Sequence, residues 1–242
     1  MRRPALILGA LLAAATAGAQ ALPLERILLP PGFTIQVYAS GLRSARGLAF
    51  SDTGTLFVGS KTGEVYAVPA GGGKARVIAE GLDMPVGAPC NVCESQGERY
   101  ANILRLDLDG RNLELFASGV RDPRFWDSRP ALEFRLPELE LPAHVAALGM
   151  RFYSGGLFPA EYRGGIFIAE HGSWNRSKKI GYRVSFVRLE EGRAAEYHTF
   201  AQGWLQGERA WGRPADVEVG PDGALYVSDD EADAVYRIGF QR

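Results

Sequence analysis

Short apolar runs separated by turn residues follow one another along nearly the whole chain beyond residue 21. Within these runs, apolar and polar positions alternate with a period close to two, which is the spacing of a half-buried β-strand. No long segment has the 3.6-residue spacing of an amphipathic helix. Thirty glycines and 14 prolines provide the turns that many short strands need. The pattern predicts an all-β fold.

Two distant segments share one layout. RGLAFSDTGTLFVGSKTGEVYAV (46–68) and RPADVEVGPDGALYVSDDEADAVYRI (213–238) each give an arginine, an apolar strand, an Asp-containing Gly turn, Leu-x-Val, a polar connection and Val-Tyr-x-apolar. A looser copy begins with GMRFYSGG (149–156), and a fragment at 100–120 contains Asp109-Gly110, a hairpin turn signal. The chain therefore contains copies of one structural unit.

The spacing of these copies favours one architecture. Repeats of about 40–45 residues with three or four strands each are typical of β-propeller blades, because one small sheet cannot bury both of its faces alone. At this period, residues 22–242 would provide about five blades. We expect 46–68 and 213–238 at equivalent positions in two blades that meet where the ring closes. A single β-sandwich is the alternative, but it explains the strands and not the repeated layout.

The N-terminal residues indicate export. Arg2 and Arg3 precede an apolar run from Ala5 to Ala19, and Ala19-Gln20-Ala21 fits the small-x-small cleavage pattern of a signal peptide. We therefore expect a signal peptide at 1–21, a single domain at 22–242, and a periplasmic or secreted protein without stable membrane insertion. The alternative is that residues 1–21 remain as an anchor, although the run is short for a span of about 20 residues.

Charge and cysteines add two limits. Loss of Arg2 and Arg3 with the leader would change the formal charge from −1 to −3, which suggests no nucleic-acid partner. Cys90 and Cys93 could close a small disulfide loop in an oxidising compartment or remain thiols. A metal site would need more ligands, and Glu94 stands where a c-type haem motif requires His.

One connection between expected strands is rich in polar and aromatic side chains. The residues 170–179 read EHGSWNRSKK. They could form a solvated hairpin, in which the lysines provide solubility and Trp174 covers the adjacent blade. They could also form a binding loop, because propeller sites usually lie on strand connections at one end of the channel.

Several segments resemble one known family. LPPGFTIQVYASGLRSARGLAF, HVAALGMRFYSG, FPAEYRGGIFIAEHGSWNRSKKIGYRV and GWLQGERAWGRPADVEVGPDGALYVSDD are similar to the sorbosone/glucose dehydrogenase family. That family consists of periplasmic six-bladed propellers that use pyrroloquinoline quinone (PQQ) and calcium. The resemblance implies a PQQ- and calcium-dependent oxidoreductase.

The resemblance also implies cofactor-binding residues. PQQ carries three carboxylates and a quinone, so its site needs cations, a planar slot and a Lewis acid. Arg213 is similar to a family arginine that reaches the cofactor, and Trp174, Asn175 and Arg176 lie on a loop like the family's cofactor loop. Arg121 resembles the first member of an Arg-Asn pair, although Asp122 follows it. The metal ligands stay unknown.

The chain also departs from the family. Between residues 68 and 87 it has less than half a blade, where the family has most of a blade and a loop histidine that acts as general base. After Asp122, PRFWDSRPALEFRLPELELP replaces a calcium-binding stretch. Two internal segments are thus missing, and we expect a shortened or incomplete propeller. His171 is the candidate substitute base, which Glu170 could orient, whereas His144 and His198 are expected at edges or in packing.

Two functions follow from this reading. The first is a periplasmic quinoprotein oxidoreductase that oxidises a sugar or a related alcohol or aldehyde and passes electrons to an unknown acceptor. Loss of the family's base segment predicts weak turnover unless His171 replaces it. The alternative is a non-catalytic propeller that binds a ligand or partner.

Overall fold

The computed structural model describes residues 21–82, 103–105, 114–117 and 139–241. Arg121, Cys90, Cys93 and nearly all of the expected signal peptide lie outside these residues. So do the two shortened regions, apart from residues 69–82 at the start of the first and 139–142 at the end of the second. The predictions that concern them therefore stay predictions.

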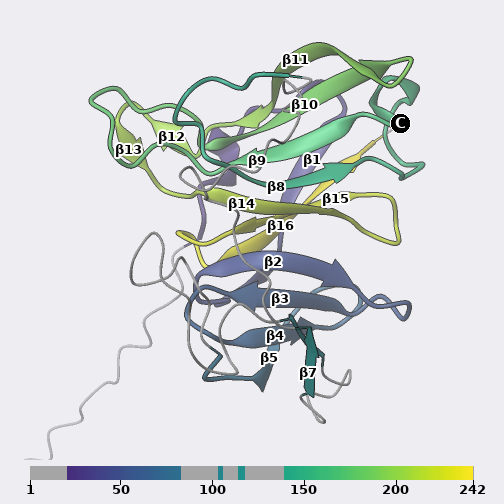
Figure 1. The fold of residues 1–242 in the computed structure, drawn as a ribbon, viewed down its shortest axis with the longest axis vertical. Coiled ribbons are helices and arrows are strands. Elements are labelled where there is room, and N and C mark those ends of the chain that lie inside the picture. The colour runs from purple at the N-terminus through teal and green to yellow at the C-terminus, as the bar shows by residue number, and fades with distance from the viewer. Residues whose placement is uncertain (1–20, 83–102, 106–113, 118–138, 242) are drawn as a thin grey trace, which may run out of the picture.

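The described residues form three four-stranded antiparallel sheets, which are blades of a β-propeller (Figure 1). The first blade contains β2 (Ala45–Phe50), β3 (Leu56–Ser60), β4 (Val65–Val68) and β5 (Arg76–Ala79). The second contains β8 (Ala147–Phe152), β9 (Ile166–Glu170), β10 (Arg183–Glu190) and β11 (Arg193–Gln202). The third contains β14 (Pro214–Val219), β15 (Leu225–Asp229), β16 (Ala234–Phe240) and β1 (Phe33–Ser40). The predicted all-β propeller is confirmed.

Short elements complete the described part of the chain. They are the paired strands β6 (Ile103–Arg105) and β7 (Glu114–Ala117), the hairpin of β12 (Leu205–Gln206) and β13 (Arg209–Ala210), and the 3-10 turns η1 (Leu24–Arg26) and η2 (Ala160–Tyr162). The β12–β13 hairpin lies in the connection from the second blade to the third.

Strand β1 closes the third blade. It pairs antiparallel with β16, from Phe33 opposite Phe240 to Ser40 opposite Ala234. The chain's first strand is therefore the outermost strand of its last blade. Residues 46–68 and 213–238 occupy the three inner strands of two adjacent blades, as predicted, and the β-sandwich alternative is wrong.

Aromatic side chains fill the interface between the second and third blades. The ring of Phe33 makes edge contacts with Phe158, Tyr162 and Phe200 at centroid distances of 4.8, 5.2 and 4.9 Å. A second apolar cluster, which includes Tyr38, joins the first blade to the third. Because each buried aromatic ring contributes about 1.5–3 kcal/mol, these interfaces hold the blades together.

A partly buried carboxylate connects the innermost strands. Asp216 of β14 accepts a hydrogen bond from the backbone N–H of Leu48 in β2 at 2.9 Å. On its other side lies Gly149 of β8, where an added Cβ would be 2.0 Å from Asp216 Oδ1. Burial raises the pKa of Asp216. This residue therefore fixes the spacing of all three blades at the centre.

Candidate functional site

Polar residues gather where the second strand of each blade ends. Ser60, Glu170 and Asp229 are the last residues of β3, β9 and β15, and all three are buried. The connections that follow these strands meet those that precede β2, β8 and β14, because the strands are paired antiparallel. We call this the loop end of the blades. It includes residues 41–44, 61–64, 139–146, 171–182, 203–213 and 230–233.

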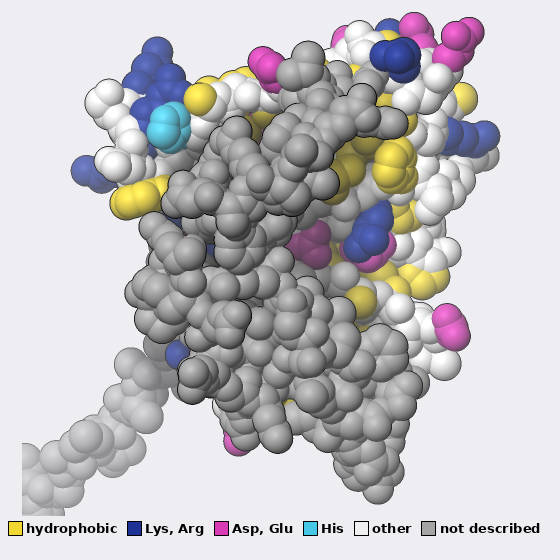
Figure 2. Space-filling view, viewed as in Figure 1, with side chains coloured by type: hydrophobic (Ala, Val, Ile, Leu, Met, Phe, Trp, Pro, Cys, Tyr) yellow, Lys and Arg dark blue, Asp and Glu magenta, His cyan; other side chains and the backbone are white. Residues whose placement is uncertain are grey.

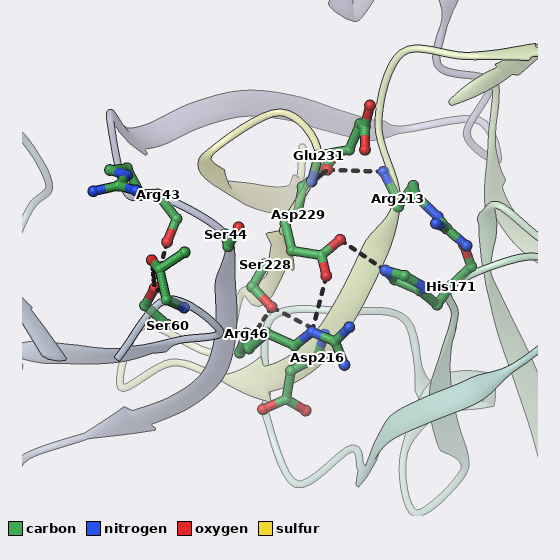
Figure 3. Close-up of polar contacts among 12 residues, drawn as sticks. Arg43, Ser44, Arg46, Ser60, His171, Arg213, Asp216, Ser228, Asp229 and Glu231 are labelled. Carbon is green, nitrogen blue, oxygen red and sulfur yellow. Dashed lines mark hydrogen bonds and ion pairs between the residues drawn. The ribbon is translucent and has the colours of Figure 1, made fainter. Parts of the chain in front are cut away.

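Three side chains from three blades meet at the loop end (Figure 3). His171 follows β9, and its Nε2 lies 2.7 Å from Oδ1 of Asp230, which follows β15. Arg46 of β2 donates from Nε to Asp230 Oδ2 at 2.8 Å. His171 is 8% exposed, so the contact is largely shielded from water.

Arg46 and the hydrogen bond with His171 keep Asp230 charged. Burial alone would raise the pKa of Asp230, but the hydrogen bond with His171 and the charge and hydrogen bond of Arg46 more than offset it. The pKa of Asp230 consequently lies below its ordinary value. The site therefore contains a fixed carboxylate that holds an imidazole.

Arg213 supports the same loop from the start of β14. Its Nε and Nη2 donate to the carbonyl oxygens of His171 and Gly172 at 3.1 and 2.8 Å. Its guanidinium lies 5.3 Å from the ring centroid of Tyr182. Gly172 has a φ of 95°, and a Cβ there would be 2.3 Å from Tyr182, so only glycine fits between the arginine and the ring.

Asp229 anchors two connections at once. Its Oδ1 accepts the backbone N–H groups of Arg213, Glu231 and Ala232 at 2.8, 3.1 and 2.9 Å, and its Oδ2 accepts the hydroxyl of Tyr236 at 2.9 Å. Burial raises the pKa of Asp229 to about 6, against the opposing effect of these hydrogen bonds. Its role is to shape the loops that carry Arg213 and Asp230.

Glu170 does not contact the candidate base. Its carboxylate accepts from Arg183 Nε at 2.7 Å and from the Tyr197 hydroxyl. The expectation that Glu170 could orient His171 is therefore wrong, and Asp230 has that place.

The other predicted loop residues are exposed and do not contact His171 or Arg213 by any hydrogen bond within the described residues. Trp174 is 85% exposed, and Asn175 is also exposed. Arg176 is exposed and donates to the carbonyl oxygen of Ala143 at 3.2 Å. The structure thus brings His171 and Arg213 together, while Trp174, Asn175 and Arg176 remain on the outer part of the loop.

The base of that loop is held firmly. Ser173 and Ile180 are linked by two hydrogen bonds, Ser173 N to Ile180 O at 2.9 Å and Ile180 N to Ser173 Oγ at 3.1 Å. The Tyr182 hydroxyl donates to the Ser173 carbonyl. Figure 2 shows Lys and Arg side chains gathered at the upper left of the molecule, the part of the view that holds β12 and β13 in Figure 1. An ordered base thus carries an exposed outer loop.

The remaining histidines behave as expected. His144 is exposed before β8, and the ring of His198 in β11 packs 5.5 Å from that of Phe186. Within the described ranges, no group of three His, Cys, Asp or Glu side chains could hold a metal ion. No helix in the described part of the chain is long and apolar enough to cross a membrane.

One curated protein matches part of this chain in sequence. An uncharacterized protein of Borreliella burgdorferi is 37% identical over 132 residues, which are 53% of this chain and 35% of that protein. This chain therefore matches about a third of the length of that curated relative.

Two solved structures share the fold. One is the holo form of the pyranose dehydrogenase PQQ domain from Coprinopsis cinerea, with a TM-score of 0.54, 15% identity, and coverage of 88% of this chain and 97% of that chain. The other is the calcium structure of a family AA12 enzyme from Trichoderma reesei, with a TM-score of 0.52, 12% identity, and coverage of 93% and 100%. A family model described as TrAA12-like matches residues 113–240, which is more than half of the sequence, and the chain therefore belongs to the TrAA12-like family.

Proposed function

We propose that this chain is a PQQ-dependent oxidoreductase of the sorbosone/glucose dehydrogenase type, which oxidises a sugar or a related alcohol or aldehyde. One observation carries the proposal. A nearly buried imidazole, His171, is held at 2.7 Å by the carboxylate of Asp230 at the loop end, and the backbone carbonyl of His171 accepts from the guanidinium of Arg213. A positioned base next to a cation suits proton removal from a substrate hydroxyl beside an anionic cofactor.

The donors at the loop end suit the negative charge of PQQ. Two nitrogens of Arg213 bind carbonyl oxygens, and no described residue engages Nη1, so this nitrogen can bind a carboxylate. Trp174, Asn175 and Arg176 add a flat surface, an amide and a second guanidinium on the exposed loop. When bound, PQQ would supply the quinone that accepts the electrons of the substrate. These four residues are the proposed cofactor-binding set, and Arg121 joins it by resemblance.

Calcium belongs to the proposal through the family resemblance. Its ligands stay unassigned, because the described residues contain no group of three suitable side chains. Titrations with and without calcium therefore test the ion separately from the quinone.

The decisive experiment is a titration of the full chain with PQQ, followed by dye-coupled turnover on a panel of sugars and aldehydes. Arg176→Ala should weaken PQQ binding about tenfold, because the proposed charge-assisted bond to a cofactor carboxylate would be lost. It should change stability little, because Arg176 is exposed and its bond to the Ala143 carbonyl is also exposed. Arg163→Ala is the matched control, since Arg163 is an exposed arginine between β8 and β9, at the opposite end of the blades. Equal affinities of the wild type and both variants would refute the cofactor role of the loop.

A non-catalytic binding propeller is the second candidate. The side chain of Trp174 favours it, because an indole that is 85% exposed on an anchored loop can stack on a ligand without any chemistry. Binding of PQQ or a sugar without turnover on any substrate of the panel would support this function over oxidation.

Export is proposed from the leader. Cleavage after Ala21 would leave Leu22 as the first residue of the mature chain. Intact-mass analysis of the protein recovered from the periplasm measures this directly, and a mass that retains residues 1–21 contradicts it.

A further inference from the structure

We infer that Asp230 is the positioning residue of His171, and that it holds the imidazole as the tautomer with a proton on Nε2 and a free lone pair on Nδ1. The catalytic meaning of this tautomer rests on the proposed function. The tautomer itself follows from the contacts on both sides of the carboxylate.

An ionised carboxylate accepts hydrogen bonds and donates none. Because Oδ1 of Asp230 lies 2.7 Å from Nε2, the neutral ring of His171 must carry its single proton on Nε2. Nδ1 is then unprotonated. Nδ1 has no hydrogen-bond partner among the described residues. Nor does Nδ1 belong to the polar atoms that are both fully buried and without a partner. Nδ1 is therefore the nitrogen that can accept a substrate proton.

The backbone of His171 is fixed as well. Its N–H donates to the Ala146 carbonyl at 2.9 Å, and its own carbonyl accepts from Arg213 at 3.1 Å. Only rotation of the side chain remains, and the bond to Asp230 removes that freedom. Asp230 thus sets both the orientation and the protonation of the ring.

Arg46 determines which atom of the side chain at position 230 faces His171. Its Nε–H donates to Oδ2 of Asp230 at 2.8 Å, and a guanidinium cannot act as an acceptor. In Asp230→Asn the amide oxygen must therefore face Arg46, so the amide NH₂ faces Nε2 of His171. Nε2 must then accept, and the ring proton moves to Nδ1. In the double variant Arg46→Met/Asp230→Asn the amide can turn, so the Nε2–H tautomer should return.

The test is long-range ¹⁵N–¹H NMR of the full chain with labelled histidine rings, recorded near pH 8, which is above the ordinary imidazole pKa of about 6.5. The protein has three histidines, and His171→Gln assigns the relevant signals. We expect Nε2–H in the wild type, Nδ1–H in Asp230→Asn and recovery of Nε2–H in the double variant. Asp233→Asn is the control, because Asp233 lies on the same loop but accepts from Ser44 N and not from the histidine.

Two results would overturn the inference. One is an Nδ1–H ring in the wild type, and the other is an unchanged ring in folded Asp230→Asn. If Asp230→Asn does not fold, the tautomers of the wild type and Arg46→Met test the inference. Arg46→Met leaves the contact between Asp230 and His171 intact, so its ring should also carry the proton on Nε2, and an Nδ1–H ring in either protein would overturn the inference.

Turnover separates this inference from the proposed function. In PQQ- and calcium-loaded protein, Asp230→Asn should lower kcat by about 10²–10⁴-fold with little change in PQQ affinity, and the double variant should recover part of the loss. A switched tautomer with undiminished kcat would refute the catalytic role of Asp230. A wild type with the expected tautomer but no turnover on any substrate would refute the proposed oxidation and leave the placement of the proton by Asp230 intact.

Discussion

Replacement of Asp229 by Asn should change the pH dependence of stability. Oδ1 of Asp229 accepts three backbone N–H groups, and an Asn oxygen can accept the same three. The Asn NH₂ would face Tyr236, whose hydroxyl can turn to accept. The substitution therefore retains the shape of the loop end and removes one ionisation from a fully buried position.

The magnitude follows from the raised pKa. The carboxyl of Asp229 titrates at about 6 in the folded protein and at 3.8 ordinarily, because burial disfavours its charged form. The folded state thus binds the proton more tightly than the unfolded chain. The stabilisation that this gives is complete below about pH 3.8 and is lost as the pH rises through about 6. At 1.36 kcal/mol per pH unit, the loss is about 3 kcal/mol.

Asn cannot ionise, so the variant escapes this loss. The destabilisation caused by Asp229→Asn should consequently be about 2.4 kcal/mol smaller at pH 7 than at pH 4, where part of the loss has already occurred. Urea unfolding of both proteins across this range measures the difference, and all other titrating groups cancel. Tyr236→Phe is the second arm: loss of its hydrogen bond should raise the pKa of Asp229 and move the transition to higher pH. A difference between wild type and Asp229→Asn that is constant with pH would refute the reasoning.

Three further substitutions test the packing and the loop. Gly149→Ala should cost about 3 kcal/mol or more in urea unfolding, because the new Cβ would lie 2.0 Å from Asp216 Oδ1, whereas Gly156→Ala, with no atom within 4 Å, should cost less than about 1 kcal/mol. Tyr153→Phe should cost about 1–3 kcal/mol, because its buried hydroxyl loses hydrogen bonds of 2.7 and 2.9 Å. Trp174→Ala should change stability by less than about 0.5 kcal/mol but weaken sugar or PQQ binding in the same titration as Arg176→Ala.

The propeller could be predicted because its signal is repeated. Each blade repeats one alternation of apolar and polar positions, so errors in a single strand do not change the period. Closure by β1 could not be derived from that period, because the pairing of Phe33 with Phe240 joins residues at opposite ends of the chain. The general rule that the first and last repeats of a propeller meet at ring closure nevertheless placed these two repeats side by side.

The residue-level alignment of the repeats was less reliable. Arg46 and Arg213 begin the two copies in the sequence. In the structure, however, Ala45 pairs with Ser60 and Pro214 pairs with Asp229. Arg46 therefore lies inside its strand and contacts Asp230, whereas Arg213 precedes its strand and binds the His171 loop. Since Ala45 and Pro214 are equivalent, Arg46 corresponds to Ala215, two residues beyond Arg213, and composition alone does not reveal this offset.

The partner of His171 was missed for a related reason. Glu170 is adjacent in sequence, but successive residues at a strand end point to opposite sides, so its carboxylate faces Arg183. The signal that could have found Asp230 is the repeat itself. His171 and Asp230 are each the first residue after the second strand of their blade, and equivalent positions of adjacent blades meet at the same end. In a propeller, the best candidate for the partner of a loop residue is thus its counterpart in the next blade, here 59 residues away.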